Sequence, residues 1–159
     1  MKDLTPKQRD LIRGTWKLVE DKGLTEVGVS MYIKLFTDHP DIQPMFPFAA
    51  NKETMEALKA SPRLKKHATG VFKTIGTAIE RLDNILSAAP DLIALGAKHY
   101  KYHIKTEHFK PIGEALVYVL GQTCGDALTP EAAEAWTDVY SIVEMAMISG
   151  FEAAKSSAE

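Results

Sequence analysis

The sequence predicts an all-α protein with a single domain. Apolar residues recur at intervals of three and four along most of the chain, and no segment alternates apolar and polar residues as a strand does. A hydroxyl residue caps exposed backbone amides, and proline suits the first helical position, where its missing N–H costs nothing. Three such pairs punctuate the chain: Thr5-Pro6, Ser61-Pro62 and Thr129-Pro130. The 159 residues suit one domain, 1–159, with a substantial core.

The first two helices are expected at residues 5–20 and 25–38. Thr5 and Gln8 have the spacing of a capping box, and Gly23 ends the first helix. Their inward faces are predicted to carry Leu11, Ile12, Trp16 and Val19, then Val29, Tyr32, Ile33 and Phe36. His39-Pro40 ends the second helix, because proline cannot continue it. A short helical turn then leads to Phe46, and residues 47–60 are expected to be irregular, with room for a short helix after Asn51.

Four further helices are expected in the remainder of the chain. The first spans 61–82 and carries one apolar stripe: Leu64, His67, Val71, Ile75, Ala78 and Leu82. Pro90 starts a shorter helix with Leu92, Leu95 and His99 on one face. The last two span 106–122 and 129–154, with inward faces made by Phe109, Ile112, Leu116, Val119 and Leu120, then Trp136, Val139, Tyr140, Val143, Met147 and Phe151.

Composition excludes several classes of protein. The net charge of −2 gives no basic excess for nucleic acid, and the apolar runs are too short to cross a membrane. The start of the chain lacks a secretory signal, so we expect a cytoplasmic protein. Cys124 is the only cysteine, which rules out an internal disulfide and suits a reducing compartment. It is expected to pack at a helix end.

Two histidines, His67 and His99, lie in the apolar stripes of different helices. Burying an imidazole without a partner costs free energy, so each needs a reason to be there. Either each is a core histidine bonded to a backbone carbonyl, or the two share a metal between their helices. Neutral imidazole is the commonest protein ligand for transition metals, and haem iron is typically held by a histidine. Phe46, in the turn after Pro40, lies upstream of both.

The order of several residues resembles the globin family over nearly the whole chain: Trp16, Lys34-Leu35-Phe36, Pro40, Phe46, His67 and His99. Other stretches are most similar to the neuroglobins and neuroglobin-like invertebrate globins: Asp10-Leu11-Ile12-Arg13, Leu95-Gly96-Ala97-Lys98-His99, Gly113-Glu114-Ala115-Leu116 and Ala135-Trp136. The resemblance implies a globin fold of about eight helices packed around a pocket for haem b, iron protoporphyrin IX.

The resemblance also implies roles for individual residues. His99 takes the proximal position and bonds the iron, and His67 takes the distal position as a possible sixth ligand. Phe46 takes the position of the aromatic ring that stacks on the haem. Val71 lies on the distal wall, and Tyr32 reaches into the distal pocket, where its phenol and His67 can both donate hydrogen bonds to dioxygen. Vertebrate neuroglobins have phenylalanine in place of Tyr32, so the tyrosine departs from that pattern.

The proximal side raises further expectations. The second ring nitrogen of His99 needs an acceptor, and the Leu95 carbonyl lies one helical turn away. Lys98 stands where some globins place a hydroxyl, so that bond is absent here. Lys98, His103 and Lys66 either reach a haem propionate or form a solvated face. Ile104 is expected among the haem contacts, with Val71 and Leu95.

Reversible binding of dioxygen, for storage, supply or transport, is the expected function, without enzymatic activity. Carbon monoxide and nitric oxide are expected to bind as well. The alternatives are a nitric oxide dioxygenase or nitrite reductase, which would need an external reductase, or a bis-histidine redox or gas sensor. The resemblance favours a hexacoordinate iron held by both histidines, whereas Tyr32 favours an open distal site, because it can hold His67 away from the iron.

Overall fold

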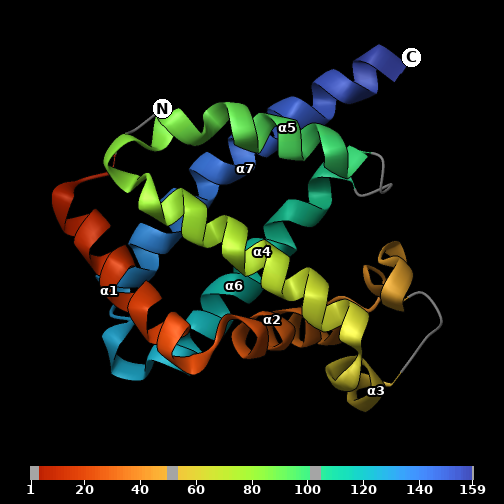
Figure 1. Cartoon of the computed structure of the whole chain (residues 1–159), viewed down its shortest axis with the longest axis horizontal. Coiled ribbons are helices and arrows are strands. Elements are labelled where there is room, and N and C mark those ends of the chain that lie inside the picture. The colour runs from red at the N-terminus through yellow and green to blue at the C-terminus, as the bar shows by residue number, and fades with distance from the viewer. Residues whose placement is uncertain (1–3, 50–53, 101–104, 159) are drawn as a thin grey trace.

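A computed structural model describes residues 4–49, 54–100 and 105–158 of the chain (Figure 1). The described residues form seven α-helices: α1 (Pro6–Lys22), α2 (Leu24–Asp38), α3 (Met55–Ala60), α4 (Pro62–Glu80), α5 (Ala89–Tyr100), α6 (Phe109–Cys124) and α7 (Pro130–Ala158). Short 3₁₀ segments lie between them: η1 (Gln43–Met45), η2 (Pro47–Ala49), η3 (Leu82–Ala88), η4 (Thr106–His108) and η5 (Gly125–Ala127). No strand occurs in these ranges, which confirms the all-α prediction.

The three hydroxyl–proline helix starts are present in the structure. The Thr5 hydroxyl accepts from the Gln8 backbone N–H at 3.1 Å, and the Gln8 side chain accepts from the Thr5 N–H at 3.0 Å. The Ser61 and Thr129 hydroxyls accept from the first turns of α4 and α7 in the same way. These bonds satisfy amides that have no partner inside the helix. The helices therefore begin where the sequence predicted.

The prediction of one helix over 61–82 is wrong at its C-terminal end. The helix α4 ends at Glu80, and the chain continues as the 3₁₀ segment η3. Asn84 breaks the helical path, since its φ of −146° and ψ of 69° lie outside the helical region. The short helix expected after Asn51 is present as α3, which starts at the Thr54 cap, and among the described residues only η2 makes 47–60 more regular than expected.

Helices α5 and α7 lie side by side and approach each other at the level of the backbone (Figure 1). A Cβ on Gly96 of α5 would lie 1.8 Å from the Met147 carbonyl oxygen, and a Cβ on Gly150 of α7 would lie 1.8 Å from that of Ile93. No side chain can occupy such a space. The two glycines therefore fix the separation of α7 from the helix that carries His99.

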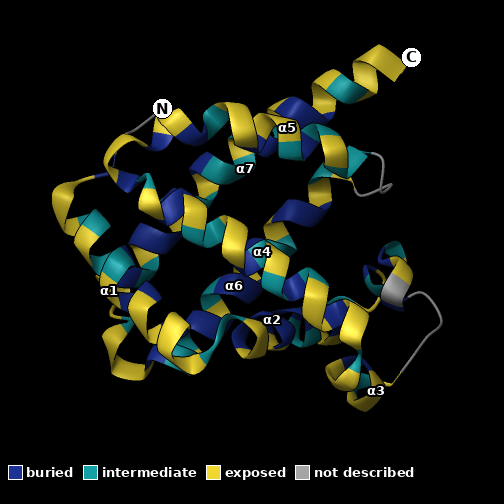
Figure 2. Cartoon of the chain, in the orientation of Figure 1, coloured by how far each residue is buried: buried dark blue, intermediate teal, exposed yellow. Residues whose placement is uncertain are grey.

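The main core joins α1, α4 and α7 through aromatic rings. The buried residues of these helices are dark blue in Figure 2. The Trp16 ring lies 6.0 Å, centroid to centroid, from both Phe72 and Trp136. The Trp136 indole donates to the Thr15 hydroxyl at 2.7 Å, and that hydroxyl donates to the Leu11 carbonyl. Burial of these rings provides the apolar contribution to stability, while the hydrogen bond satisfies the indole N–H.

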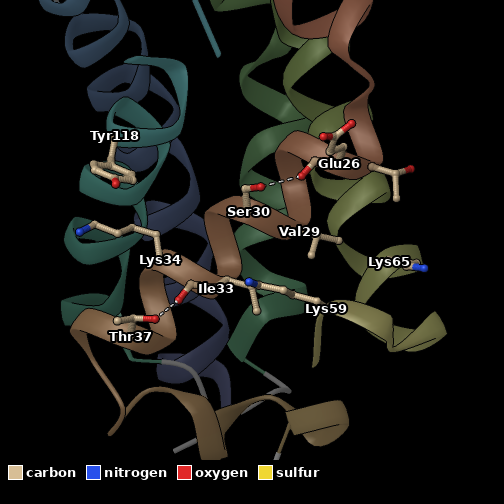
Figure 3. Close-up of a pocket in the computed structure, with 10 residues that line it drawn as sticks. Glu26, Val29, Ser30, Ile33, Lys34, Thr37, Lys59, Lys65 and Tyr118 are labelled. Atoms are coloured by element: carbon tan, nitrogen blue, oxygen red, sulfur yellow. Dashed lines mark hydrogen bonds between the residues drawn. The ribbon is translucent and has the colours of Figure 1, made fainter. Parts of the chain in front are cut away.

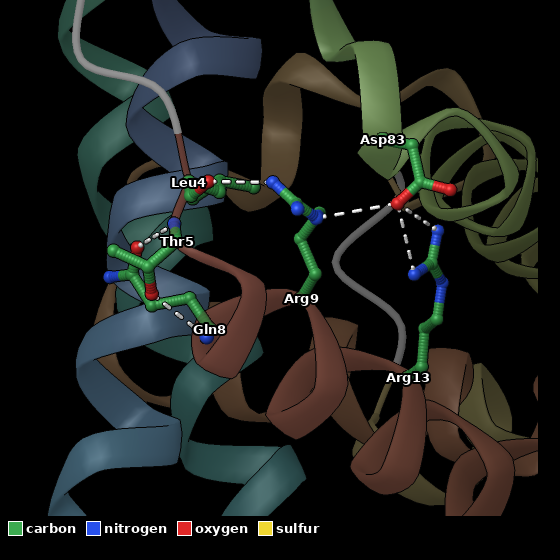
Figure 4. A network of polar contacts seen from close by, with 6 residues as sticks. All are labelled: Leu4, Thr5, Gln8, Arg9, Arg13 and Asp83. Carbon is green, nitrogen blue, oxygen red and sulfur yellow. Dashed lines mark hydrogen bonds and ion pairs between the residues drawn. The ribbon is translucent and has the colours of Figure 1, made fainter.

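Polar contacts tie the start of α1 to the segment η3 (Figure 4). The Arg9 guanidinium donates to the Leu4 carbonyl at 2.8 Å and lies 3.3 Å from the Asp83 carboxylate. Arg13 approaches the same carboxylate at 3.3 Å. Asp83 is exposed, so these pairs orient the segments and add little to stability.

Candidate functional site

A cavity of about 710 Å³ lies inside the helical assembly. Its walls come from α2, α4, α5, α6 and α7, with the chain around η1 closing one side. Seven of the residues singled out from the sequence line it: Tyr32, Phe46, His67, Val71, Leu95, Lys98 and His99. The two histidines, which lie on the successive helices α4 and α5, thus face one space. His103 and Ile104 lie outside the described residues.

The helix α4 presents two different apolar stripes. Ala68 and Phe72 are fully buried in the core. His67, Val71 and Ile75 are only half-buried, although the sequence pattern predicts that they face inward. They do face inward, but toward the cavity. Their partial exposure is therefore the signature of a helix that packs against the core with one stripe and lines a hollow with the next.

On the α5 side, His99 is held by its own helix and by α6. Its Nδ1 lies 2.7 Å from the Leu95 carbonyl oxygen, which is the bond expected from the sequence. A carbonyl only accepts, so Nδ1 carries the proton in this bond and Nε2 has the lone pair that can bind a metal. The Phe109 ring lies 6.4 Å from the imidazole, centroid to centroid. The donor atom of His99 is thus oriented by one hydrogen bond and one aromatic contact.

On the opposite wall, Tyr32 and His67 are joined by a hydrogen bond. The Tyr32 hydroxyl lies 3.1 Å from Nε2 of His67. Burial raises the pKa of the Tyr32 phenol far above its usual range, so the phenol stays neutral and can donate. Burial lowers the pKa of the His67 imidazole, and the nearby His99 lowers it further, so the imidazole is neutral and can accept. Both shifts favour a bond in which Tyr32 donates to His67.

Phe46 belongs to an aromatic cluster beside this pair. Its ring makes edge-on contacts with Tyr32 at 5.5 Å and with His67 at 5.8 Å, centroid to centroid. Phe36 adds a third edge-on contact with Phe46 at 5.5 Å. Such contacts stabilise ring orientation beyond simple burial. The cluster holds the Tyr32–His67 pair in place, while stacking of Phe46 on a haem remains a prediction.

Three exposed cations line the cavity as well: Arg63, Lys66 and Lys98. None of them forms an ion pair with a carboxylate of the described chain. Arg63 was not singled out from the sequence, although it precedes His67 by one helical turn. Gly70 also lines the cavity, and a Cβ there would meet open space, so no packing contact requires this glycine.

Tyr140 is a second cavity residue for which the sequence pattern predicts only an inward-facing position. It lines the cavity from α7, and its hydroxyl donates to the Phe109 carbonyl. Its ring occupies the space above Gly113, where a Cβ would lie 2.6 Å from Tyr140 Cε2. Periodicity placed the ring inward but did not indicate the partner of its hydroxyl, because the two residues are 31 positions apart.

A second hollow, of about 760 Å³, is a groove on the outer face of α2 (Figure 3). Lys34 extends over the Tyr118 ring, with its ammonium 4.2 Å from the centroid, and Lys59 and Lys65 lie farther along the groove. Its lining contains no histidine, and most of its side chains are exposed. The groove thus offers no imidazole ligand, in contrast to the interior cavity.

The interior cavity fits a haem by its size, its chemistry and its donors. Two imidazoles face it from different helices, its walls are mainly apolar, and exposed cations stand where carboxylates of a ligand can reach water. Across the residues that the structure describes, no group of three or more histidine, cysteine or acidic side chains could hold a bare metal ion. The donor set therefore suits a metal that arrives inside an apolar cofactor.

Comparison with known proteins gives consistent results. A family model described as Globin matches residues 29–147. The chain is 34% identical over 151 residues to a neuroglobin of Chaenocephalus aceratus, covering 95% of this chain and 94% of that protein. It is 34% identical over 152 residues to neuroglobin-1 of Oncorhynchus mykiss and 31% identical over 151 residues to a neuroglobin of Danio rerio, each with the same coverage. None of the described helices is long and apolar enough to span a membrane.

Proposed function

The chain belongs to the globin family, and on that premise we propose that it binds dioxygen reversibly at a haem b held between His99 and the Tyr32–His67 pair. The observation that carries the proposal is the 3.1 Å hydrogen bond from Tyr32 to His67 in a cavity that His99 also lines. Tyr32 and His67 offer two hydrogen-bonding groups to that cavity. His99 offers one imidazole, whose Nδ1 is bonded to the Leu95 carbonyl.

When bound, haem supplies an iron that binds small gases reversibly and can exchange one electron. His99 would hold this iron through Nε2, since its Nδ1 is committed to the Leu95 carbonyl. Val71 and Ile75 would exclude water from the distal side, and Phe46 would contact the ring of the cofactor. Lys66, Lys98 and Arg63 would meet its propionates. Each charge-assisted bond of this kind is stronger than a neutral one.

Tyr32 and His67 distinguish a carrier from a bis-histidine sensor. Nε2 of His67 cannot accept from Tyr32 and bind iron with the same lone pair. Ligation by His67 therefore requires loss of the Tyr32 bond, and this cost favours the open distal site. Because the Tyr32 hydroxyl has a single proton, it can donate to dioxygen, which carries partial negative charge, only after it releases His67. Carbon monoxide, being less polar, would gain less from the same donor.

Conversion of nitric oxide to nitrate is the second candidate function. It would use the same pocket, would take both added oxygen atoms from dioxygen and would need one electron for each nitrate from a separate reductase. Nitric oxide is uncharged, so the exposed cations Arg63, Lys66 and Lys98 at the cavity favour this function only by attracting an acidic redox partner. The cytoplasm is the expected setting of either function, because a lone buried thiol, Cys124, suits a reducing compartment.

The first test is the visible absorption spectrum of the purified protein after reduction under nitrogen. One broad band indicates a five-coordinate iron and supports a carrier in which Tyr32 retains His67. Sharp, split bands indicate that both histidines bind the iron and contradict the open site. Reversible oxygenation with slow autoxidation supports the carrier, whereas rapid consumption of nitric oxide in the presence of a reductant supports the enzyme. Absence of a haem band after addition of haem overturns both.

A further inference from the structure

We propose that Tyr140 is a positioning residue for the proximal histidine, acting through Phe109. The inference rests on the proposed haem site, because it concerns how His99 presents Nε2 to an iron. Tyr140 lies on α7, Phe109 begins α6, and His99 lies near the end of α5. The three residues thus connect the three helices that enclose the proximal side of the cavity.

The first step is the hydrogen bond between Tyr140 and Phe109. The Tyr140 hydroxyl donates to the Phe109 carbonyl, in the first turn of α6. Phe109 is almost fully buried, at 4% exposure, so water does not compete for its carbonyl. Burial raises the pKa of the Tyr140 phenol far above its usual range, and the Glu144 carboxylate raises it further. The phenol therefore keeps its proton and remains a donor.

The second step is the fit of the Tyr140 ring into α6. Gly113 lies one turn after Phe109 on α6 and has no side chain with which the Tyr140 ring would clash. A Cβ at this position would lie 2.6 Å and 2.8 Å from two ring carbons of Tyr140. The ring and the hydroxyl thus contact the same turn of α6. Together they determine where that turn lies relative to α7.

The third step connects Phe109 to His99. The two rings lie 6.4 Å apart, centroid to centroid, and are tilted by 50°. The Leu95 carbonyl limits the rotation of the imidazole about its own side-chain bonds. The Phe109 ring limits the tilt of the imidazole from outside α5. A displacement of the first turn of α6 would therefore change the direction of Nε2 without breaking the bond to Leu95.

The position of α5, the helix that carries His99, is restricted by its close contact with α7. Gly96 and Gly150 hold α5 against α7 at backbone distance, so α5 itself has little room to move. The Phe109 ring contacts the imidazole from α6, a different helix, and its position can change while α5 stays in place. Because Tyr140 also lies on α7, this one helix positions both α5, which carries His99, and the Phe109 ring, which packs on the imidazole.

The test uses holoprotein in a His67→Leu background, in which only one axial histidine remains. Resonance Raman spectroscopy of the reduced protein then reports the iron–histidine stretching band. Tyr140→Phe keeps the ring and removes the hydroxyl, and we expect it to shift this band. The same variant should also lose haem faster to an acceptor apoglobin, because the first turn of α6 is less firmly held. Tyr118→Phe, an exposed tyrosine on α6, is the matched control and should change neither quantity.

A double variant separates positioning from a general loss of structure. Phe109→Leu should shift the band as well, and Tyr140→Phe combined with Phe109→Leu should match Phe109→Leu alone, because the hydroxyl then has no ring to position. Additive shifts, or an unchanged band in Tyr140→Phe, would overturn the inference. Where Tyr140→Phe does not fold, Gly113→Ala provides the test, because its Cβ displaces the Tyr140 ring while the hydroxyl remains; an unshifted band there also overturns it.

The two proposals fail in different ways. If the parent protein takes up no haem with a single axial histidine, the proposed function fails and the role of Tyr140 fails with it. If haem is bound through His99 in every variant but the band stays constant, only the role of Tyr140 fails. Circular dichroism of the apoproteins confirms that the variants compared have equal helical content.

Discussion

Replacement of Tyr32 by phenylalanine is expected to accelerate the dissociation of dioxygen. The change removes one hydroxyl, which lies 3.1 Å from Nε2 of His67, and keeps the ring. The ring retains its contacts with Phe36 at 5.9 Å and Phe46 at 5.5 Å, so the aromatic cluster remains packed. Tyr32 is 3% exposed, so bulk water has little access to the position of its hydroxyl.

The magnitude follows from the loss of one donor in a closed pocket. A net hydrogen bond contributes about 1 kcal/mol, and up to about 1.5 kcal/mol in a favourable geometry. Since 1.4 kcal/mol corresponds to a factor of ten, the dissociation rate of dioxygen should rise roughly fivefold to tenfold. Dissociation of carbon monoxide should change less, because that ligand is less polar. The two gases together therefore separate a lost hydrogen bond from a general loosening of the pocket.

Stopped-flow displacement of dioxygen by carbon monoxide measures the dissociation rate directly. Tyr118→Phe is the control, since this tyrosine is exposed on α6 away from the cavity lining. A second readout is the spectrum of the reduced protein, because loss of the Tyr32 bond leaves His67 able to bind the iron. An unchanged dissociation rate, with unchanged coordination in the reduced spectrum, would refute both the donor role and the retaining role of Tyr32.

Three further predictions concern the fold. Gly96→Ala should lower the stability by about 1–3 kcal/mol or prevent folding, because its Cβ would overlap a carbonyl of α7. Gly14→Ala is the control and should be neutral or stabilising, because its Cβ meets open space. Equal melting temperatures of the two variants would contradict this prediction. The folded chain holds the Tyr140 proton more tightly than the unfolded chain, so this contribution to stability is complete below about pH 10 and falls above it by up to about 1.4 kcal/mol per pH unit. Urea unfolding of the parent and of Tyr140→Phe at several alkaline pH values measures this loss of stability. Equal slopes of unfolding free energy against pH in the two proteins would refute the prediction. Thr15→Val leaves the Trp136 indole N–H without its acceptor and should cost about 1–3 kcal/mol in urea unfolding, whereas no loss would show that another group accepts.

The helix starts could be predicted because their signals are local. Thr5, Ser61 and Thr129 each cap the helix that follows them directly, so the partner of every hydroxyl lies within three residues. The end of α4 could not be predicted in this way. The apolar pattern continues through Leu82, whereas the backbone of α4 ends at Glu80, with Arg81 as its C-cap at φ −103° and ψ 17°.

Candidate site residues could be predicted where a polar residue interrupts an apolar stripe. His67 and His99 stand out for that reason, and the bond from His99 to the Leu95 carbonyl follows from helical geometry. The contact between Tyr32 and His67 joins residues 35 positions apart, so only their resemblance to a known arrangement suggested it. Arg63 and Tyr140 gave no such signal, because a cation on a polar face and an aromatic ring on an apolar face are ordinary.

The sequence by itself determined the all-α class, the beginnings of the helices and the two histidines as the residues that need explanation. Each of these depends on residues within a few positions of one another, where backbone geometry dictates which side chains are neighbours. Only the tertiary structure decided that one stripe of α4 lines a cavity while another packs in the core, and that Tyr140 bonds to Phe109. Those features depend on how closely whole helices approach, and this distance is determined at Gly96 and Gly150 by the mutual fit of two backbones.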